Sequence, residues 1–178
     1  RDRRRLRPVR TAGAVAKKKE RIFLMTSPTP TAFPPVTQER IASTLEAMDL
    51  KYFREDGGEC RTAFPGLVVF FEVEREGFKA TSRWMAVVDQ PEDVEKLREF
   101  ANVMNRTLPL VRVHPVLRQD GTAIAIMEAP FFSGDGFADT QLREMCEYFF
   151  SAIHHVAGQL RETFPGLEES FNDGAKEA

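Results

Sequence analysis

The residues that carry most metal and redox chemistry in proteins are scarce in this chain. Its 178 residues include two cysteines and three histidines. Cys60 and Cys146 lie far apart in the sequence, each among apolar neighbours. This placement predicts two buried thiols in a reducing compartment, with no disulfide between them.

The histidines do not form a metal-binding pattern. His154 and His155 are adjacent in a segment with helical periodicity, so their side chains diverge by about 100° and cannot chelate one ion as an i, i+4 pair does. His114 stands alone in a strand-like run, and Cys146 lies two helical turns from His154. We therefore expect no metal site and no cofactor.

Long hydrophobic runs are also missing. No apolar stretch approaches the roughly 20 residues that a transmembrane helix needs, and the run 22–25 is too short for a signal peptide. Hydrophobic residues make up 42% of the chain and charged residues 29%, which fits one globular domain with tails. The sequence therefore predicts a cytoplasmic protein with no membrane partner.

Charge is unevenly distributed, although the net charge is −2. Residues 1–21 hold ten lysines or arginines, so the rest of the chain carries 15 of the 25 basic residues and 25 of the 27 acidic ones. The predicted folded part is thus acidic, which argues against nucleic-acid binding by that part. Residues 1–35, basic and then rich in proline and threonine, are predicted to be a disordered leader. We expect the native protein to start at Met25.

Three segments have the apolar spacing of amphipathic helices. The predicted helices, each with its expected N-cap, are 38–48 with Thr37, 91–105 with Asp89, and 139–163 with Asp139. The last is the longest, and Pro165 ends its pattern because proline cannot continue a helix.

Between these helices lie short runs typical of β-strands. The predicted strands are a short one beginning at 52, then 61–64, 67–73, 79–88, 110–117 and 123–129. Turn signals at Asp56-Gly57-Gly58 and at Gln119 to Thr122 separate some of them, the second as a two-residue Asp-Gly hairpin turn. Pro115 predicts that its strand bends or lies at a sheet edge.

The element order is helix, three or four strands, helix, two strands, helix. Consecutive hairpins and three amphipathic helices predict an α+β fold, a two-layer sandwich of an antiparallel sheet with helices on one face. We expect this domain to span residues 36–169 and a flexible tail to follow at 170–178.

Four short motifs, in this order along the chain, resemble the YbjN family. They are Ser82-Arg83-Trp84, Asn102-Val103-Met104-Asn105, Asp120-Gly121 and Phe164-Pro165. The two asparagines match the family's asparagine-rich helix end, whereas Met104 stands where the family usually has a tryptophan. The resemblance implies a fold like that of type III secretion chaperones, in the order α-β-β-β-α-β-β-α. It also implies a link to bacterial stress and sensory regulation, and it carries over no functional residue.

Two polar features are candidate sites. The loop Ser133–Gly136 precedes the last helix, where backbone amides could cradle an anion. It lacks the lysine and threonine of a phosphate-binding loop and the full dinucleotide fingerprint, so a plain connection is the favoured interpretation. The carboxylates of Glu92, Asp93, Glu95 and Glu99 fall on the exposed face of the second helix. With no catalytic constellation found, we predict that the protein is not an enzyme.

Aromatic residues suggest an interaction surface instead. Fifteen phenylalanines are more than one small core readily hides. Trp84 is expected in the core, but consecutive strand residues point to opposite faces, so either Phe70 or Phe71 faces away from the helices. The leading hypothesis is a homodimer, formed through an apolar sheet or helix surface, that binds a protein or peptide as a chaperone or regulator. The alternative is a small-molecule-binding sensory domain with a pocket between sheet and helices.

Overall fold

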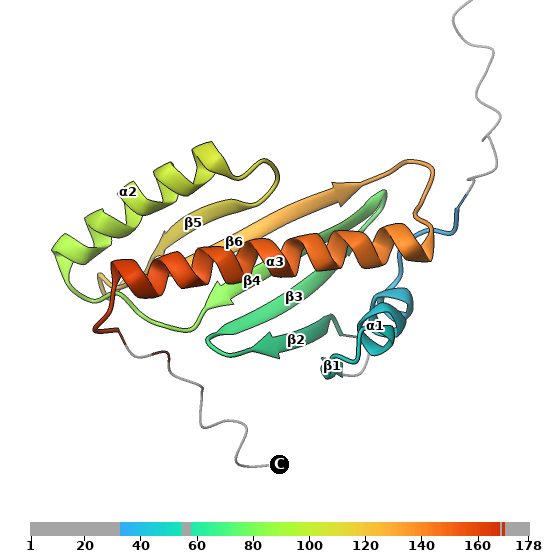
Figure 1. Cartoon of the computed structure of the whole chain (residues 1–178), viewed down its shortest axis with the longest axis horizontal. Helices are drawn as coiled ribbons and strands as arrows, with labels where there is room; N and C mark the ends of the chain where they lie inside the picture. Colours follow the sequence, from blue (N-terminus) through green and yellow to red (C-terminus); the bar gives the residue numbers. More distant parts are fainter. Residues whose placement is uncertain (1–32, 55–57, 168, 170–178) are drawn as a thin grey trace, which may run out of the picture. The chain divides into compact units, whose positions relative to one another are not determined.

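The structure is a computed structural model that describes residues 33–54, 58–167 and 169. Its elements follow in the order α1 (Gln38–Ala47), β1 (Tyr52–Arg54), β2 (Cys60–Phe64), β3 (Leu67–Glu74), β4 (Gly77–Trp84), α2 (Pro91–Thr107), β5 (Arg112–Leu117), β6 (Ala123–Phe132) and α3 (Asp139–Thr163). Figure 1 shows α3 lying across the sheet, with α1 near β1 and β2 and α2 beside β5. The predicted order of helices and strands is confirmed.

The six strands form one sheet in the order β1-β2-β3-β4-β6-β5. Every neighbouring pair is antiparallel. The helix α2 carries the chain from β4 past the place of β6 to β5, and β6 then returns between them. The predicted α+β fold with an antiparallel sheet is confirmed.

Alternate strand residues face the helices and build the core. In β3 these are Leu67, Val69 and Phe71, all fully buried. Phe150 of α3 meets the ring of Phe71 edge-on at 6.2 Å between centroids. Helix and sheet residues belong to a single buried cluster, and each large side chain in it stabilises the fold by about 1.5–3 kcal/mol.

Two of the three predicted helix caps are wrong. Ala138 is the cap of α3 and Asp139 is its first helical residue, because the Asp139 carboxylate pairs with Arg40 of α1 instead of with the first-turn amides. The cap of α2 is Gln90 and not Asp89, and it makes no side-chain capping bond. Thr37 caps α1 as predicted, since its hydroxyl accepts a hydrogen bond from the first-turn amide of α1 at 3.2 Å.

Two strands end at different places than predicted. β4 stops at Trp84 and not at residue 88, because its partner β3 begins at Leu67 and the ladder closes with that pair. β6 continues through Pro130 to Phe132. Beyond its last pair with β5, at Glu128, β6 has a strand on one side only, so the missing N–H of the proline is tolerated there.

The β5–β6 hairpin has a three-residue loop, not the predicted two-residue turn. The amide of Arg118 donates to Thr122 O at 2.8 Å, which leaves residues 119–121 as the loop. A two-residue Asp-Gly turn needs positive φ at both residues, whereas Gly121 has φ +85° and Asp120 is not in that region. The other predicted turn, Asp56-Gly57-Gly58, lies mostly outside the described residues.

The free edge of β5 is covered by a side chain. Pro115 lies in this edge strand, as predicted. Next to it, Asn105 of α2 donates from Nδ2 to Val113 O at 2.9 Å and accepts from Val113 N at 2.7 Å. The asparagine amide thus takes the place of a further strand and blocks edge-to-edge pairing.

Candidate functional site

The sheet face that points away from the helices, which we call the outer face, carries the strand residues that alternate with the core. Its central row, in register across the strands, is Phe53, Arg61, Phe70, Thr81, Glu128 and Arg112. The adjacent row is Ala63, Val68, Arg83, Ile126 and His114. Phe70 is therefore the member of the Phe70-Phe71 pair that faces away from the helices.

Apolar side chains on the outer face are left partly accessible. Phe53 is 66% exposed, and Val68, Phe70 and Ile126 are half-buried. The guanidinium carbon of Arg61 lies 5.3 Å from the centre of the Phe70 ring, a cation–π distance. Aromatic residues and arginine are the types enriched in protein–protein interfaces, so this face has the composition of a protein-binding surface.

Charged residues of both signs stand among these apolar groups. Lys79 Nζ pairs with Glu72 Oε2 at 2.7 Å, and the hydrogen bond from that pair raises the pKa of Lys79. His114 Nε2 lies 3.0 Å from Glu128 Oε1 on the neighbouring strand. The outer face therefore offers positive and negative groups at fixed positions of one rigid sheet.

Arg83 occupies the centre of the second row. Its Nε is buried and has no hydrogen-bond acceptor among the described residues. Burial, and then the charge of Arg118, lower the pKa of Arg83. A buried guanidinium nitrogen without an acceptor costs stability in the single chain.

A second polar cluster joins the sheet to the segment that follows α3. The buried Trp84 donates from Nε1 to Glu169 Oε1 at 2.6 Å. Arg161 of α3 holds the same carboxylate, from Nε at 2.7 Å and from Nη2 at 3.1 Å. Gly66 makes room for it, since a Cβ there would lie 2.1 Å from Glu169 Oε2. Two of the family-like motif residues, Trp84 and Phe164, also meet here, with ring centroids 6.2 Å apart.

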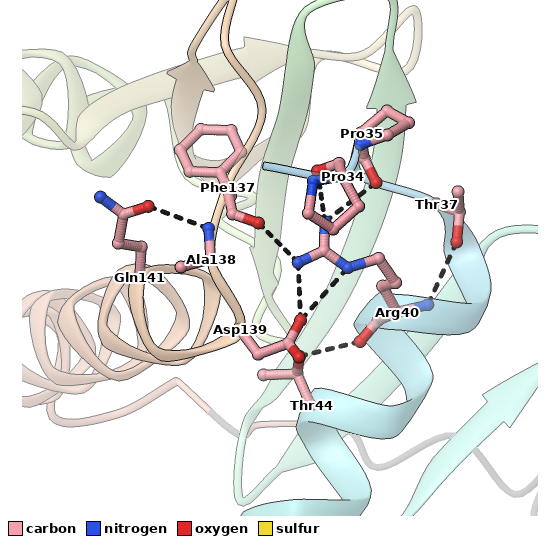
Figure 2. Close-up of polar contacts among 9 residues, drawn as sticks. All are labelled: Pro34, Pro35, Thr37, Arg40, Thr44, Phe137, Ala138, Asp139 and Gln141. Carbon is pink, nitrogen blue, oxygen red and sulfur yellow. Dashed lines mark hydrogen bonds and ion pairs between the residues drawn. The ribbon is translucent and has the colours of Figure 1, made fainter. Parts of the chain in front are cut away.

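A third cluster surrounds Arg40 of α1 (Figure 2). Its Nη1 donates to the carbonyl oxygens of Pro34 and Pro35 at 2.7 and 2.9 Å. Its Nη2 donates to Phe137 O and to Asp139 Oδ1, both at 2.6 Å. The guanidinium is therefore saturated, and the cluster ties the segment before α1 to the start of α3.

The loop 133–136, the candidate anion site, makes backbone hydrogen bonds of its own. The amide of Ser133 donates to Glu76 O at 2.8 Å, and that of Gly136 to Ser133 O at 3.1 Å. The amide of Phe137 donates to Pro34 O, and that of Ala138 to the Gln141 side chain. Two of the four loop amides, and the two amides that follow the loop, are therefore used by the chain itself.

The remaining predicted groups are the two cysteines and the three histidines. Cys60 and Cys146 are free and buried, as predicted, and burial raises the pKa of Cys146 to about 12. His155 is exposed on α3, and His154 beside it has one side of its ring packed against Phe64, whereas His114 lies on the outer face. Within the described part of the chain, no group of three or more metal-ligating residues comes together, and no helix is long and apolar enough to cross a membrane.

Sequence reasoning missed Arg61 on the outer face and the Glu169 contact. The alternation of β2 placed Arg61 on one face of its strand, which is a signal that could have been used. Nothing local marks Glu169, because its partner Trp84 is 85 positions away.

A family match and one solved structure agree with this architecture. Residues 37–162 match the model of the YbjN family, described as "Putative bacterial sensory transduction regulator". The crystal structure of "YbjN, a putative transcription regulator from E. coli" superposes with a TM-score of 0.63 at 10% identity, covering 75% of this chain and 96% of that one. An uncharacterized protein from Methanothermobacter thermautotrophicus matches with a TM-score of 0.47 at 16% identity, over 72% of this chain and 99% of that one. Among curated protein sequences, none matches this chain.

Proposed function

Because this chain belongs to the YbjN family of putative bacterial sensory transduction regulators, we propose that it is a non-enzymatic regulatory module that acts by binding protein through the outer face of its sheet. The first occupant of that face is a second copy of the chain, so the working unit is a homodimer. The dimer in turn recognises a protein or peptide partner in the cytoplasm.

One observation carries this proposal: the outer face keeps Phe53, Phe70 and neighbouring apolar groups partly exposed while all three helices pack against the opposite face. A two-layer fold leaves one sheet face for water or for another chain. Glu72 and Glu128 lie among its arginines. This mixture of charges favours a protein over nucleic acid, whose phosphates would be repelled by the carboxylates.

A small-molecule pocket between sheet and helices, the alternative hypothesis, has less support. The described residues in that layer are almost all apolar and close to fully buried. Ser82 is a polar exception, with its hydroxyl buried and without a hydrogen-bond partner among the described residues. The buried hydroxyls of Thr44 and Thr62 already donate to backbone carbonyl oxygens. One remaining serine hydroxyl gives a ligand little to recognise, so we favour the interaction surface.

Light scattering on the full chain tests the proposal. We expect a mass of twice the 20.2 kDa of one chain, falling to the monomer value when Phe70→Glu places a charge in the centre of the outer face. The matched control is Val103→Glu, which puts the same charge on the exposed surface of α2 and should leave the dimer intact. A monomeric parent protein, or a dimer that Phe70→Glu leaves unchanged, would contradict the proposal.

A further inference from the structure

We propose that the two copies pack outer face to outer face about a two-fold axis that runs parallel to the strands, between β3 and β4. This inference rests on the proposed function and specifies its geometry. It follows from the strand order, from the register across the strands, and from the positions of the charges.

The strand order gives the sheet a natural centre. With six strands in the order β1-β2-β3-β4-β6-β5, the line between β3 and β4 has three strands on each side. Rotation about that line lays β3 over β4 of the second copy, β2 over β6 and β1 over β5. Each row of residues then faces the same row of the second copy. Aligned sheets pack about 10 Å apart at an angle near −30°, so alignment is best close to the axis.

Charges in the central row become complementary under this rotation. Arg61 of β2 comes to lie opposite Glu128 of β6 in the second copy, and the symmetry makes this contact twice. Phe53 of β1 comes to lie opposite Arg112 of β5, which suits a cation–π contact. In the row on the other side, Glu72 meets Lys79. Each of these facing positions follows from the strand register.

The other in-plane two-fold axis, perpendicular to the strands, is disfavoured by the same residues. An axis along the central row would lay every residue of that row over its own copy. Arg61 would face Arg61 and Glu128 would face Glu128, and like charges in direct opposition disfavour association. The charge pattern therefore selects the axis parallel to the strands.

Arg83 provides a second test of the proposed arrangement. It lies beside the axis, paired in register with Val68, so the rotation brings two Arg83 side chains near each other. This approach opposes association. We therefore expect Arg83→Gln to tighten the dimer, whereas it would weaken binding if the outer face held an acidic partner segment instead.

Charge reversal across the interface tests the arrangement. Within one chain Arg61 and Glu128 stand three strands apart, roughly 14 Å at about 4.8 Å per strand, so they cannot form a direct ion pair there. Arg61→Glu and Glu128→Arg should each raise the dimer dissociation constant at least about tenfold, because each creates two like-charge contacts. The double variant should restore the parent value. Arg106→Glu, exposed on α2, is the control expected to have no effect.

Mixing the two single variants gives the sharpest result. In a mixed dimer both Arg61–Glu128 contacts again join opposite charges, so we expect the two weakly associating variants to form a heterodimer, measured by light scattering and by native mass spectrometry. Circular dichroism checks that each variant is folded. A parent dimer whose association neither reversal changes, or two variants that do not associate, would overturn the arrangement and leave the proposed function standing. A monomeric parent chain would overturn both.

Discussion

Trp84 and Glu169 are joined by a hydrogen bond of 2.6 Å between the indole Nε1 and the carboxylate Oε1. The bond connects a central strand of the sheet to a residue beyond the end of α3. Because Trp84 is fully buried, water cannot replace the carboxylate as the hydrogen-bond acceptor of its N–H. The contact is therefore expected to govern both stability and the surroundings of the indole.

Replacement of Glu169 tests this contact. Glu169→Ala should lower the free energy of unfolding by about 1–3 kcal/mol, since it leaves the indole N–H without its acceptor and leaves the Arg161 guanidinium only its bond to Pro65 O. Trp84 is the only tryptophan of the chain, so its fluorescence spectrum should shift in the same variant. Glu144→Ala, at an exposed glutamate of α3, is the control for removal of a surface charge. An unchanged spectrum and unfolding midpoint in Glu169→Ala would show that the contact is unimportant in solution.

Gly66 should be energetically coupled to Glu169. Gly66 has φ +76°, where a Cβ would lie 2.1 Å from the carboxylate. Gly66→Ala should therefore cost about 1–2 kcal/mol from backbone strain and a further amount from displacement of Glu169. In the Glu169→Ala background, the cost of displacing the carboxylate should vanish and only the cost of backbone strain should remain. A double-mutant cycle by urea unfolding measures the difference, and strictly additive costs would contradict the proposed crowding.

The long helix and the two sheet faces were predictable because their signals are local. The apolar stripe from residue 139 to 163 and the stop at Pro165 gave both ends of α3. The run 67–73 gave β3 to within one residue. The period of two also showed that Phe70 and Phe71 face opposite sides, although it could not say which faces the helices.

The errors arose where a distant residue decides the local structure. Asp139 has the sequence features of a helix cap, but its carboxylate accepts a hydrogen bond from Arg40, 99 positions away. Pro130 looked like the end of a strand, but the course of β6 at that point depends on β4, where Pro130 pairs with Lys79. The rows of the outer face likewise depend on a strand order that places β6 between β4 and β5, which hydrophobic periodicity does not encode.

His154 should make stability depend on pH. Burial against the rest of the fold, and then the charge of Arg161, lower the pKa of His154, and the ring packs edge-on against Phe64 at 4.8 Å. As the pH falls through the unfolded-state pKa of about 6.5, the unfolded chain takes up the proton first. The contribution of neutral His154 to the free energy of unfolding should thus be fully present above that pH and should be lost progressively as the pH falls below it.

Unfolding of variants at several pH values isolates this effect. For one proton the slope cannot exceed about 1.4 kcal/mol per pH unit, and screening at a partly exposed side chain makes it smaller. His154→Gln should flatten the curve between pH 7 and pH 5. His155→Gln, at the exposed neighbour on the same helix, should leave the slope as it is. Equal slopes for the parent protein and His154→Gln would contradict the assignment.

Replacement of the two asparagines at the end of α2 should change the free energy of unfolding by very different amounts. Asn105 makes both a donated and an accepted hydrogen bond to the backbone of Val113, whereas Asn102 is exposed on the same helix. Asn105→Ala should lower the free energy of unfolding by about 1–3 kcal/mol, because two backbone groups of an edge strand lose their hydrogen-bond partners. Asn102→Ala should leave the free energy of unfolding within about 0.5 kcal/mol of the parent value.

Loss of the Asn105 contact should also uncover the edge of β5. An unprotected edge strand pairs with other chains, so Asn105→Ala should form higher oligomers as its concentration rises, and Asn102→Ala should not. Hydrogen exchange at Val113 gives the local readout, since its amide is held by the Asn105 side chain at 2.7 Å. Faster exchange at Val113 in Asn105→Ala alone would establish that this asparagine closes the sheet. Equal protection in both variants would show that Pro115 and the short length of β5 are enough to do so.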